Sequence, residues 1–282
     1  MGCSPADSAK VVKYSSRPWK SVIPARCQAA GMKDAHDAYG HSVWDYFNGR
    51  QAYEVIERSD GLIDPSEVAP KLYFAKFDDW PEVERKAIGC ARGRVLDVGC
   101  GAGRVALYLQ DQRKLDVLGI DLSPLAVKVC KLRGLRKARL MAFENVDFKP
   151  GSFDSIVMFG NNFGLFGSRA KAQRLLKRLS SMASPGAVLI GESVDPYKTD
   201  NPDHLEYQRR NRERGRMSGQ VRIRARYRTY IGRWFDYLLV SQAEMKDVVE
   251  GTGWRVQRFI TSRESPLYVG ILRNASHPLT RC

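Results

Sequence analysis

Short apolar runs alternate with amphipathic segments through the middle of the chain. The apolar runs have the length of buried strands, and apolar residues in the segments between them recur at helical spacing. The sequence therefore predicts strands at residues 95–98, 115–120, 138–142, 155–158 and 187–190, and helices at 104–112, from Ser123-Pro124 onward, and at 168–183. Because strands and helices alternate, we expect a parallel, doubly wound α/β sheet.

A different pattern begins after Glu192. Pro196, Asn201 and Pro202 open an insertion that becomes helical over residues 205–216. Residues 221–231 then alternate, with Val221, Ile223, Ala225 and Tyr227 on one face and Arg222, Arg224, Arg226 and Arg228 on the other. This period of two predicts a half-buried strand.

The last part of the chain is expected to complete the sheet. Ser241 and Glu244 have the spacing of a capping box, in which each side chain satisfies a free backbone N–H, so a helix should run to about Gly251. Strands near residues 255–260 and 267–272 follow. The expected fold is a Rossmann-like, mostly parallel sheet of seven strands.

These patterns divide the chain into four parts. Residues 1–33 are polar, basic and poorly periodic, and we expect a flexible arm there. Residues 34–91 are expected to form an N-terminal helical cap, because aromatic residues recur at roughly helical spacing after Asp34 and Pro81 suits the first position of a second helix. The core is assigned to residues 92–195 and 240–275, and residues 196–239 form an Arg-rich insertion.

Length and composition narrow the class of protein. The chain has 282 residues, 43% hydrophobic and 27% charged, which suits one large soluble α/β domain. It contains no apolar run long enough for a membrane span, and its start lacks the apolar stretch of a secretory signal, so we expect a cytoplasmic protein. The six cysteines include no C-x-x-C pair, which disfavours a zinc or redox site.

A glycine-rich loop carries the strongest chemical signal. Asp97-Val98-Gly99-Cys100-Gly101-Ala102-Gly103 lies between an apolar strand and a helix. Glycines there allow unusual backbone dihedrals and let a ligand approach without a Cβ in the way. Open α/β sheets bind ligands at this carboxyl edge. Asp97 is therefore placed to meet a cationic ligand.

A second acid ends the next predicted strand. Val117-Leu118-Gly119-Ile120 is apolar, and Asp121 follows it, 18 residues after Gly103. A carboxylate at that position can accept hydrogen bonds from both hydroxyls of a ribose. The two acids and the loop between them are typical of an adenosine-cofactor site.

The stretches VLDVGCGAGR and GIDLSP resemble the first two motifs of the class I S-adenosylmethionine (SAM)-dependent methyltransferases, in the broad group that includes menaquinone and small-molecule enzymes. The resemblance covers about residues 92–192. It implies that Asp97 binds the amino group of SAM, that Asp121 binds the ribose, and that Leu122 lies beside the adenine. The loop passing the methionyl part of SAM would be formed by Gly99, Cys100, Gly101 and Gly103.

The resemblance also implies contacts further along the chain. Family members often carry an acid that meets the adenine amino group where this sequence has Ala142, so we expect the backbone at Phe143 to take over that contact. Asn161, at the end of the fourth predicted strand, is expected to orient the acceptor or the cofactor. The Asp/Asn-Pro-Pro-aromatic sequence of DNA amino-methyltransferases is missing there, which disfavours methylation of base amino groups.

Two other classes of protein fit parts of the pattern. Gly101, Gly103 and Ala106 also satisfy a relaxed dinucleotide fingerprint, so a nicotinamide-dependent enzyme is an alternative, although that interpretation leaves Asp97 and Gly99 unexplained. A SAM-binding regulator without turnover is another alternative.

The charge is large and uneven. The net charge is +15, and residues 207–235 contain ten arginines against one acid, Glu213. Such a segment attracts anions. Because insertions at this point of the fold usually cover the acceptor pocket, we expect a small, anionic acceptor bound by Arg222, Arg224, Arg226 and Arg228. RNA, or a protein bound to RNA, is the alternative acceptor.

Catalytic candidates are few. Tyr39 is expected at the mouth of the cofactor site, on the N-terminal helix. Of the four histidines, His204 and His41 are the better candidates for a general base, and none has metal-ligand spacing, so we expect no metal. The pattern does not indicate the oligomeric state.

Overall fold

The structure is a computed structural model that describes residues 34–275. A seven-stranded sheet, here called the central sheet, has the order β11-β12-β7-β6-β3-β4-β5. Its first five strands in the sequence pair in parallel with one another, and β12 pairs antiparallel with both β7 and β11. The strands are β3 (Arg94–Val98), β4 (Asp116–Asp121), β5 (Ala138–Leu140), β6 (Phe153–Met158), β7 (Ala183–Val194), β11 (Trp254–Thr261) and β12 (Leu267–Asn274). The predicted Rossmann-like fold is confirmed.

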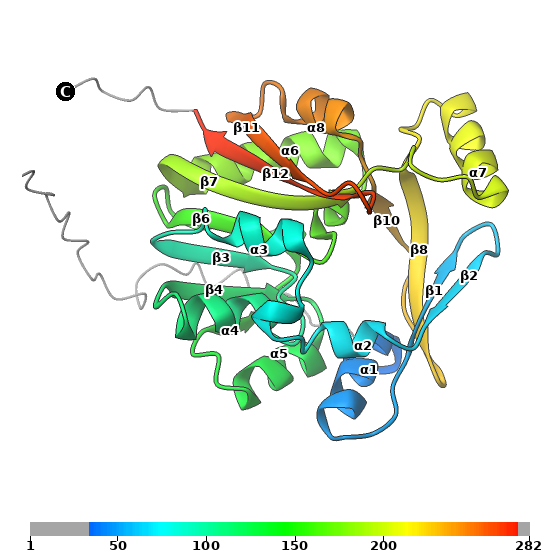
Figure 1. Ribbon diagram of the computed structural model, residues 1–282, viewed down its shortest axis with the longest axis horizontal. Coiled ribbons are helices and arrows are strands. Elements are labelled where there is room, and N and C mark those ends of the chain that lie inside the picture. Colours follow the sequence, from blue (N-terminus) through cyan, green and yellow to red (C-terminus); the bar gives the residue numbers. More distant parts are fainter. Residues whose placement is uncertain (1–33, 276–282) are drawn as a thin grey trace, which may run out of the picture.

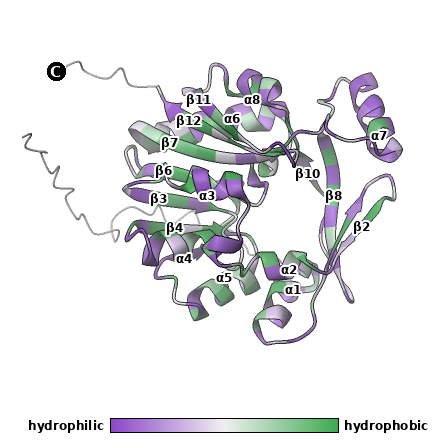
Figure 2. Ribbon diagram, viewed as in Figure 1, coloured by the Kyte–Doolittle hydropathy of each residue, from purple (hydrophilic) through white to green (hydrophobic). Residues whose placement is uncertain are grey.

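Helices cover both faces of the central sheet (Figure 1). On one face α6 and α8 bury Leu175, Leu179 and Met245, and on the other α3 and α4 bury Val83 and Leu109. The central strands are largely apolar, as Figure 2 shows, because side chains on both of their faces are buried. The helices are α3 (Glu82–Ile88), α4 (Arg104–Asp111), α5 (Pro124–Leu132), α6 (Arg169–Met182) and α8 (Gln242–Val249).

Two predicted helix starts are confirmed by their caps. The Ser123 hydroxyl accepts a hydrogen bond from the backbone N–H of Ala126 at 3.0 Å and so begins α5. Ser241 and Glu244 form the expected capping box at the start of α8. No helix within residues 34–275 is long and apolar enough to cross a membrane.

A second sheet, here called the side sheet, joins segments far apart in the sequence. Its order is β10-β8-β1-β2, with β9 paired to β8. Figure 1 shows it beside the carboxyl ends of the parallel strands. The strands are β1 (Glu54–Arg58), β2 (Ile63–Ser66), β8 (Gln220–Tyr227), β9 (Tyr230–Ile231) and β10 (Phe235–Leu238).

The side sheet changes what was expected of two segments. Residues 34–91, predicted as a helical cap, contain helices but also strands β1 and β2. The alternation expected over residues 221–231 is interrupted at Arg228, which has a φ of 50° in a turn between β8 and β9. The division of the chain into the four predicted parts stays a prediction. The remaining elements are η3 (Asp34–His36), α1 (Ala38–Phe47), α2 (Ala69–Leu72), η4 (Phe77–Asp79), η5 (Phe143–Asn145), η6 (Asn162–Phe166) and α7 (Pro202–Glu213).

Helix α1 connects the two sheets. At its start, Asp37 accepts a hydrogen bond from the Ser123 hydroxyl at 2.8 Å, which ties α1 to the cap of α5. Further along α1, Asp45 accepts a hydrogen bond from the hydroxyl of Tyr227 on β8, also at 2.8 Å. The side sheet is thus held against the core through buried polar contacts of α1.

The contact between Tyr227 and Asp45 gives a first prediction. Tyr227→Phe removes a buried hydroxyl that donates to a carboxylate, and should lower the free energy of unfolding by about 1–2 kcal/mol, measured by denaturant unfolding. Tyr230→Phe is the matched control, because the Tyr230 hydroxyl makes no hydrogen bond to any of the described residues. Equal losses in the two variants would contradict this role for the Tyr227 hydroxyl.

Candidate active site

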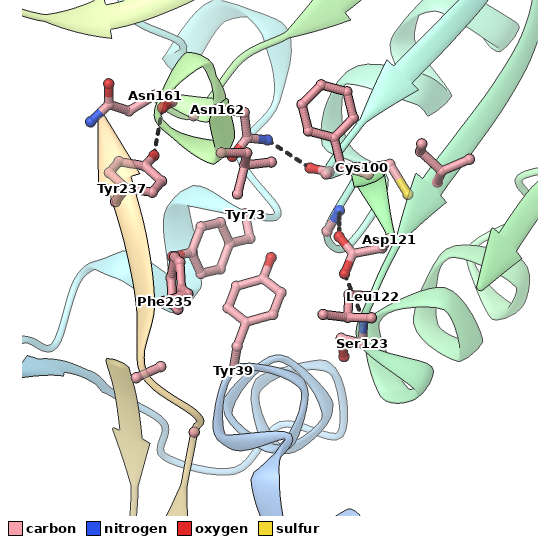
Figure 3. A pocket seen from close by; sticks show the side chains of 18 of the residues that line it. Tyr39, Tyr73, Cys100, Asp121, Leu122, Ser123, Asn161, Asn162, Phe235 and Tyr237 are labelled. Atoms are coloured by element: carbon pink, nitrogen blue, oxygen red, sulfur yellow. Dashed lines mark hydrogen bonds between the residues drawn. The ribbon is translucent and has the colours of Figure 1, made fainter. Parts of the chain in front are cut away.

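A cavity of about 820 Å³ lies between the carboxyl ends of the parallel strands and the inner face of the side sheet (Figure 3). The loop after β3, the end of β4 and the segment after β6 form one wall, with Asp97, Asp121 and Asn161. Strands β1, β8 and β10 form the opposite wall. Residues from α1 and η3 line the cavity as well, so segments distant in the sequence share one site.

Asp97 lies at the base of the first wall. It is 2% exposed, and its Oδ2 atom has no hydrogen-bond partner among the described residues. Burial raises the pKa of Asp97 to about 7, although the Arg104 guanidinium opposes this shift. A buried carboxylate oxygen without a partner is costly, so the site favours a ligand that brings a cationic donor to Asp97.

The glycine loop curves past Asp97 with positive φ at Gly99 and Gly101. Both glycines line the cavity. A Cβ at Gly99 would lie 2.5 Å from Nδ2 of Asn162, and one at Gly101 would lie 2.4 Å from the Tyr39 hydroxyl. Only glycine fits these two positions, and their backbone stays accessible to a ligand.

Gly103 was expected to join that loop, and its position corrects this expectation. It does not line the cavity. It has a φ of 83° as the N-cap of α4, and a Cβ there would lie 3.0 Å from Cys130 Sγ on α5. The third glycine of the motif therefore serves the turn into α4 and the packing of that helix.

Asp121 is held by the loop that it faces. Its Oδ2 accepts a hydrogen bond from the backbone N–H of Gly101 at 2.8 Å, and its Oδ1 accepts one from the backbone N–H of Ser123 at 2.9 Å (Figure 3). Burial raises the pKa of Asp121 to about 6. Each carboxylate oxygen can accept a second hydrogen bond, which leaves capacity for two ligand hydroxyls.

An apolar slot adjoins Asp121. Leu122 lines it and is 39% exposed, while Met141 and Phe143 line it from the segment after β5 and are buried. Ala142 was expected in this slot but does not line the cavity. Successive residues of an extended segment point to opposite sides, so Met141 and Phe143 share a side that Ala142 lacks. An exposed leucine against a buried aromatic residue suits a flat heterocycle.

Cys100 lines the cavity but is not a nucleophile. Its hydrogen bond with the Cys130 thiol, 3.8 Å away, together with burial, raises its pKa well above the ordinary range of a thiol. The thiol therefore stays protonated and packs the loop against α5.

Asn161 lies at the cavity in a left-handed conformation, with a φ of 61°. Its backbone N–H donates to Glu192 at 2.7 Å, and its side-chain Oδ1 accepts from the backbone N–H of Val194 at 3.1 Å. Its carbonyl accepts a hydrogen bond from the Tyr237 hydroxyl at 2.5 Å. These contacts place Asn161 as a residue that positions the loop after β6, and its expected role toward acceptor or cofactor stays a prediction.

Of the three side chains Tyr39, His41 and His204, considered as catalytic candidates, one lines the cavity. Tyr39 lines the cavity, and burial raises the pKa of its hydroxyl well above the ordinary value. His204 does not line it: this residue lies on α7, where Nδ1 is 3.1 Å from the Thr199 hydroxyl. His41 does not line it either, because its ring bonds Asp34 and stacks on Tyr230. The expectation of a general base at His204 or His41 is corrected accordingly.

Of the histidines within residues 34–275, His36 is the one that lines the cavity. Its Nδ1 lies 3.0 Å from the carbonyl oxygen of Ile231, so Nδ1 donates and Nε2 is the acceptor in the neutral ring. The sequence offered no signal for this position, because the contact depends on β9, which lies far away along the chain.

The four arginines expected to bind the acceptor lie on the wrong face of the side sheet. The cavity is lined instead by Ile223 and Ala225, from the apolar face of β8. Acids neutralise the arginine face: Glu57 bonds Arg224 at 2.8 Å and Arg226 at 3.2 Å. Asp236 is 3.6 Å from Arg222, and Asp45 is 3.3 Å from Arg228.

The second wall contains residues that the sequence analysis did not single out. Apolar, aromatic and acidic side chains face the cavity there: Glu54, Ile56, Tyr73, Phe235 and Tyr237. Residues 54–58 form strand β1, but three of the five are charged, so the sequence shows no clear alternation of apolar and polar positions there. Of the described residues, no group of three His, Cys, Asp or Glu side chains is arranged to hold a metal ion.

Comparison with known proteins decides the class. Residues 95–186 match the family described as a methyltransferase domain. A SAM-dependent methyltransferase from Bacteroides fragilis, solved with S-adenosyl-L-homocysteine (SAH), is 25% identical with a TM-score of 0.74, over 87% of this chain and 98% of its own. These matches support a class I SAM-dependent methyltransferase.

Further relatives agree with this assignment. A SAM-dependent methyltransferase from Methanosarcina mazei shares the fold, with 17% identity and a TM-score of 0.54 over 71% of this chain and 100% of its own. The norajmaline N-methyltransferase of Rauvolfia serpentina is 26% identical over 128 residues, which span 42% of this chain and 39% of that relative.

The cavity of this methyltransferase fits SAM. The unpartnered Oδ2 of Asp97 suits the amino group of the methionyl part, and the backbone of Gly99 and Gly101 lines the cavity beside it. Asp121 would hold the ribose hydroxyls, and Leu122, Met141 and Phe143 would enclose the adenine. Of the residues expected to bind the cofactor, Gly103 and Ala142 alone lie away from the cavity.

Asp121 gives a prediction for cofactor affinity. Asp121→Ala removes hydrogen bonds from a carboxylate to the ribose, and should weaken SAM and SAH binding by roughly tenfold to a hundredfold. Isothermal titration calorimetry measures both affinities. Asp79→Ala, at an exposed acid of η4 outside the cavity, is the control. Unchanged affinity in the Asp121 variant would contradict the ribose assignment.

Asp97 gives a prediction for pH dependence. Its pKa of about 7 in the folded protein without ligand exceeds the value near 3.9 that an unfolded chain shows. The folded state therefore binds the extra proton at intermediate pH, and this contribution to stability is complete below about pH 4 and lost as the pH rises through about 7. The amino group of SAM favours the carboxylate, so binding near pH 6 should release a proton.

Calorimetry in buffers of different ionisation enthalpy measures that release. Asp97→Asn should reduce the number of protons released, and only the part contributed by Asp121 should persist. The affinity of the unchanged protein for SAM should rise with pH up to about 7 and then level off. A proton release that is the same in the variant would contradict the role of Asp97.

Proposed function

We propose that this protein transfers the methyl group of SAM to a small molecule that lies against the inner face of the side sheet. One observation carries the proposal: a single cavity joins the cofactor cradle of Asp97 and Asp121 to a separate wall of apolar and aromatic side chains. Its volume of about 820 Å³ is in the upper part of the range typical of small-molecule sites.

The chain's contribution to this reaction is mainly alignment. SAM supplies a methyl group already activated for in-line displacement. Fixing the acceptor opposite that methyl group can lower the barrier by roughly 7–11 kcal/mol. The cradle holds one reactant and the side sheet holds the other. His36 Nε2 and the Glu54 carboxylate are two of the cavity groups that can receive a proton.

A small-molecule acceptor is supported by relatives that act on small molecules. The names of two of them specify such acceptors: a norajmaline N-methyltransferase, and an amino pentose methyltransferase from Micromonospora echinaspora with a TM-score of 0.51. Similarity of this degree does not carry their acceptors over to this chain. It favours a small organic molecule over a polymer.

The charge of the acceptor is a separate question. The expectation of an anionic acceptor depended on Arg222, Arg224, Arg226 and Arg228, which pair with acids outside the cavity. Among the arginines of the insertion, Arg233 is the one that lines the cavity, and it is exposed at the rim. An anionic acceptor would thus depend on Arg233. RNA binding is also less favoured, because the acids neutralise much of the positive charge that would attract phosphates.

A metabolite screen tests the proposed function. We expect the purified protein to convert SAM to SAH in a cell extract and to leave one small molecule heavier by one methyl group, detected by mass spectrometry. Asp121→Ala should abolish both signals at low SAM. Label in RNA in place of small molecules would favour the RNA alternative, and SAM binding without SAH formation in any extract would indicate a regulator.

The arginine face gives a second test. Arg224→Ala with Arg226→Ala removes the partners of Glu57, and should lower the melting temperature by no more than a few degrees, because ion pairs near solvent contribute little to stability. The KM for the acceptor should stay unchanged, because neither arginine lines the cavity. A raised KM with unchanged stability would show that the arginines bind the acceptor.

A further inference from the structure

We propose that the acceptor is an amine, bound through its protonated amino group by the Glu54 carboxylate within a set of aromatic rings on the side-sheet wall. The inference rests on the proposed function and adds the chemical class of its substrate. It depends on the position of Glu54, on the groups that surround it and on the contrast with its neighbour Glu57.

Glu54 and Glu57 lie on the same strand but on opposite faces of the side sheet. Glu57 pairs with Arg224 across the sheet and bonds two arginines on the outer face. Glu54 lies on the inner face with Ile56 and lines the cavity. Its Oε2 accepts a hydrogen bond from the Tyr73 hydroxyl at 2.9 Å, and Oε1 has no partner among residues 34–275. The inner acid therefore lacks the counter-charge that the outer one has.

Two of the three Lys and Arg side chains that line the cavity, Arg104 and Lys171, are paired with acids. Arg104 bonds Glu84 with both of its terminal nitrogens, at 2.6 Å and 2.8 Å. Lys171 pairs with Glu144 at 2.5 Å, and Arg233 is exposed at the rim. Burial raises the pKa of Glu54, and the hydrogen bond from Tyr73 only partly opposes this. A carboxylate in this setting gains from a ligand that brings its own positive charge.

Aromatic rings complete a site suited to a cation. The rings of Tyr39 and Tyr73 meet edge to face at 5.2 Å, and those of Phe235 and Tyr237 at 6.1 Å. Figure 3 shows Tyr73 and Phe235 on the side of the cavity away from Asp121, and Tyr39 between them and Asp121. Aromatic faces attract ammonium groups, and more strongly where water is excluded. The apolar side chains of Ile56, Ile223 and Ala225 would pack against the rest of the molecule.

The same arrangement serves the methyl transfer. The bound ammonium first gives one proton to a base, for which the Glu54 carboxylate is in place. The nitrogen lone pair then forms the bond to the methyl carbon while the carbon–sulfur bond breaks and its electron pair stays on sulfur, which yields SAH. The product forms as an ammonium ion that carries the methyl group, and it leaves either in that form or after giving one N–H proton to solvent.

Three aromatic probes of matched size separate the charge classes. They are phenethylamine, which is cationic, 2-phenylethanol, which is neutral, and phenylacetate, which is anionic. Binding of each to the full chain saturated with SAH is measured by ligand-observed NMR and calorimetry at about pH 7. We expect the amine to bind best. Preference for phenylacetate, or no binding of the amine, would overturn the inference.

Variants test which side chain is responsible. Glu54→Gln keeps the shape and an oxygen for the Tyr73 hydroxyl, and should weaken amine binding by roughly tenfold to a hundredfold. Glu57→Gln is the matched control on the outer face and should leave amine affinity unchanged. Tyr73→Phe should give a smaller loss, because it frees the carboxylate without removing it. An effect of Arg233→Ala on probe binding that exceeds that of Glu54→Gln would overturn the inference in favour of an anionic acceptor.

Cofactor binding distinguishes this inference from the proposed function. If the unchanged protein binds neither SAM nor SAH, the proposed function itself fails. If Glu54→Gln binds SAH normally, the fold and the cradle are intact and the amine measurements decide. A variant that loses affinity for SAM but not for the neutral SAH would show that Glu54 faces the sulfonium charge, which would overturn its assignment to the acceptor.

Discussion

The site depends on one electrostatic constraint, the burial of carboxylates at the carboxyl edge of a parallel sheet. Asp97 and Asp121 end adjacent strands, and burial raises the pKa of both. The protein reduces the cost for Asp121 with two backbone N–H groups but leaves Oδ2 of Asp97 without a partner. A ligand with an ammonium group and a diol can donate hydrogen bonds to both carboxylates, the ammonium to Asp97 and the diol to Asp121. The preference for SAM is thus a consequence of how the two acids are desolvated.

The same constraint extends behind the site. Arg104 opens α4 directly after the glycine loop and bonds the buried Glu84 of α3. Glu192 on β7 lies close to Glu84, and burial together with that neighbouring carboxylate raises its pKa. Its Oε1 accepts the backbone N–H of Asn161, which fixes the left-handed turn after β6. One arginine and two acids therefore connect the glycine loop after Asp97 with the loop after β6, where the Asn161 carbonyl accepts a hydrogen bond from Tyr237.

The core and cradle could be predicted from the sequence because their signals are local. The strand, the glycine loop and the acid at each strand end lie within a few residues of one another, and Ser123 caps the helix that follows. The side sheet could not be predicted in the same way. Strand β1 pairs with β8 across about 170 residues, and charged side chains interrupt its pattern. A pattern of alternation also cannot tell which face meets a ligand.

Strand β8 shows why that last ambiguity matters. Its alternation was recognised, and four arginines on one face invited a role in binding an anion. The partner strand resolves the choice, since β1 brings Glu57 opposite Arg224 and Ala225 opposite Ile56. Charges of opposite sign meet on the outer face, and apolar residues meet on the inner one. Glu54 lies on the inner face, away from these arginines, and a basic sequence folds into a cavity whose second wall is apolar, aromatic and acidic.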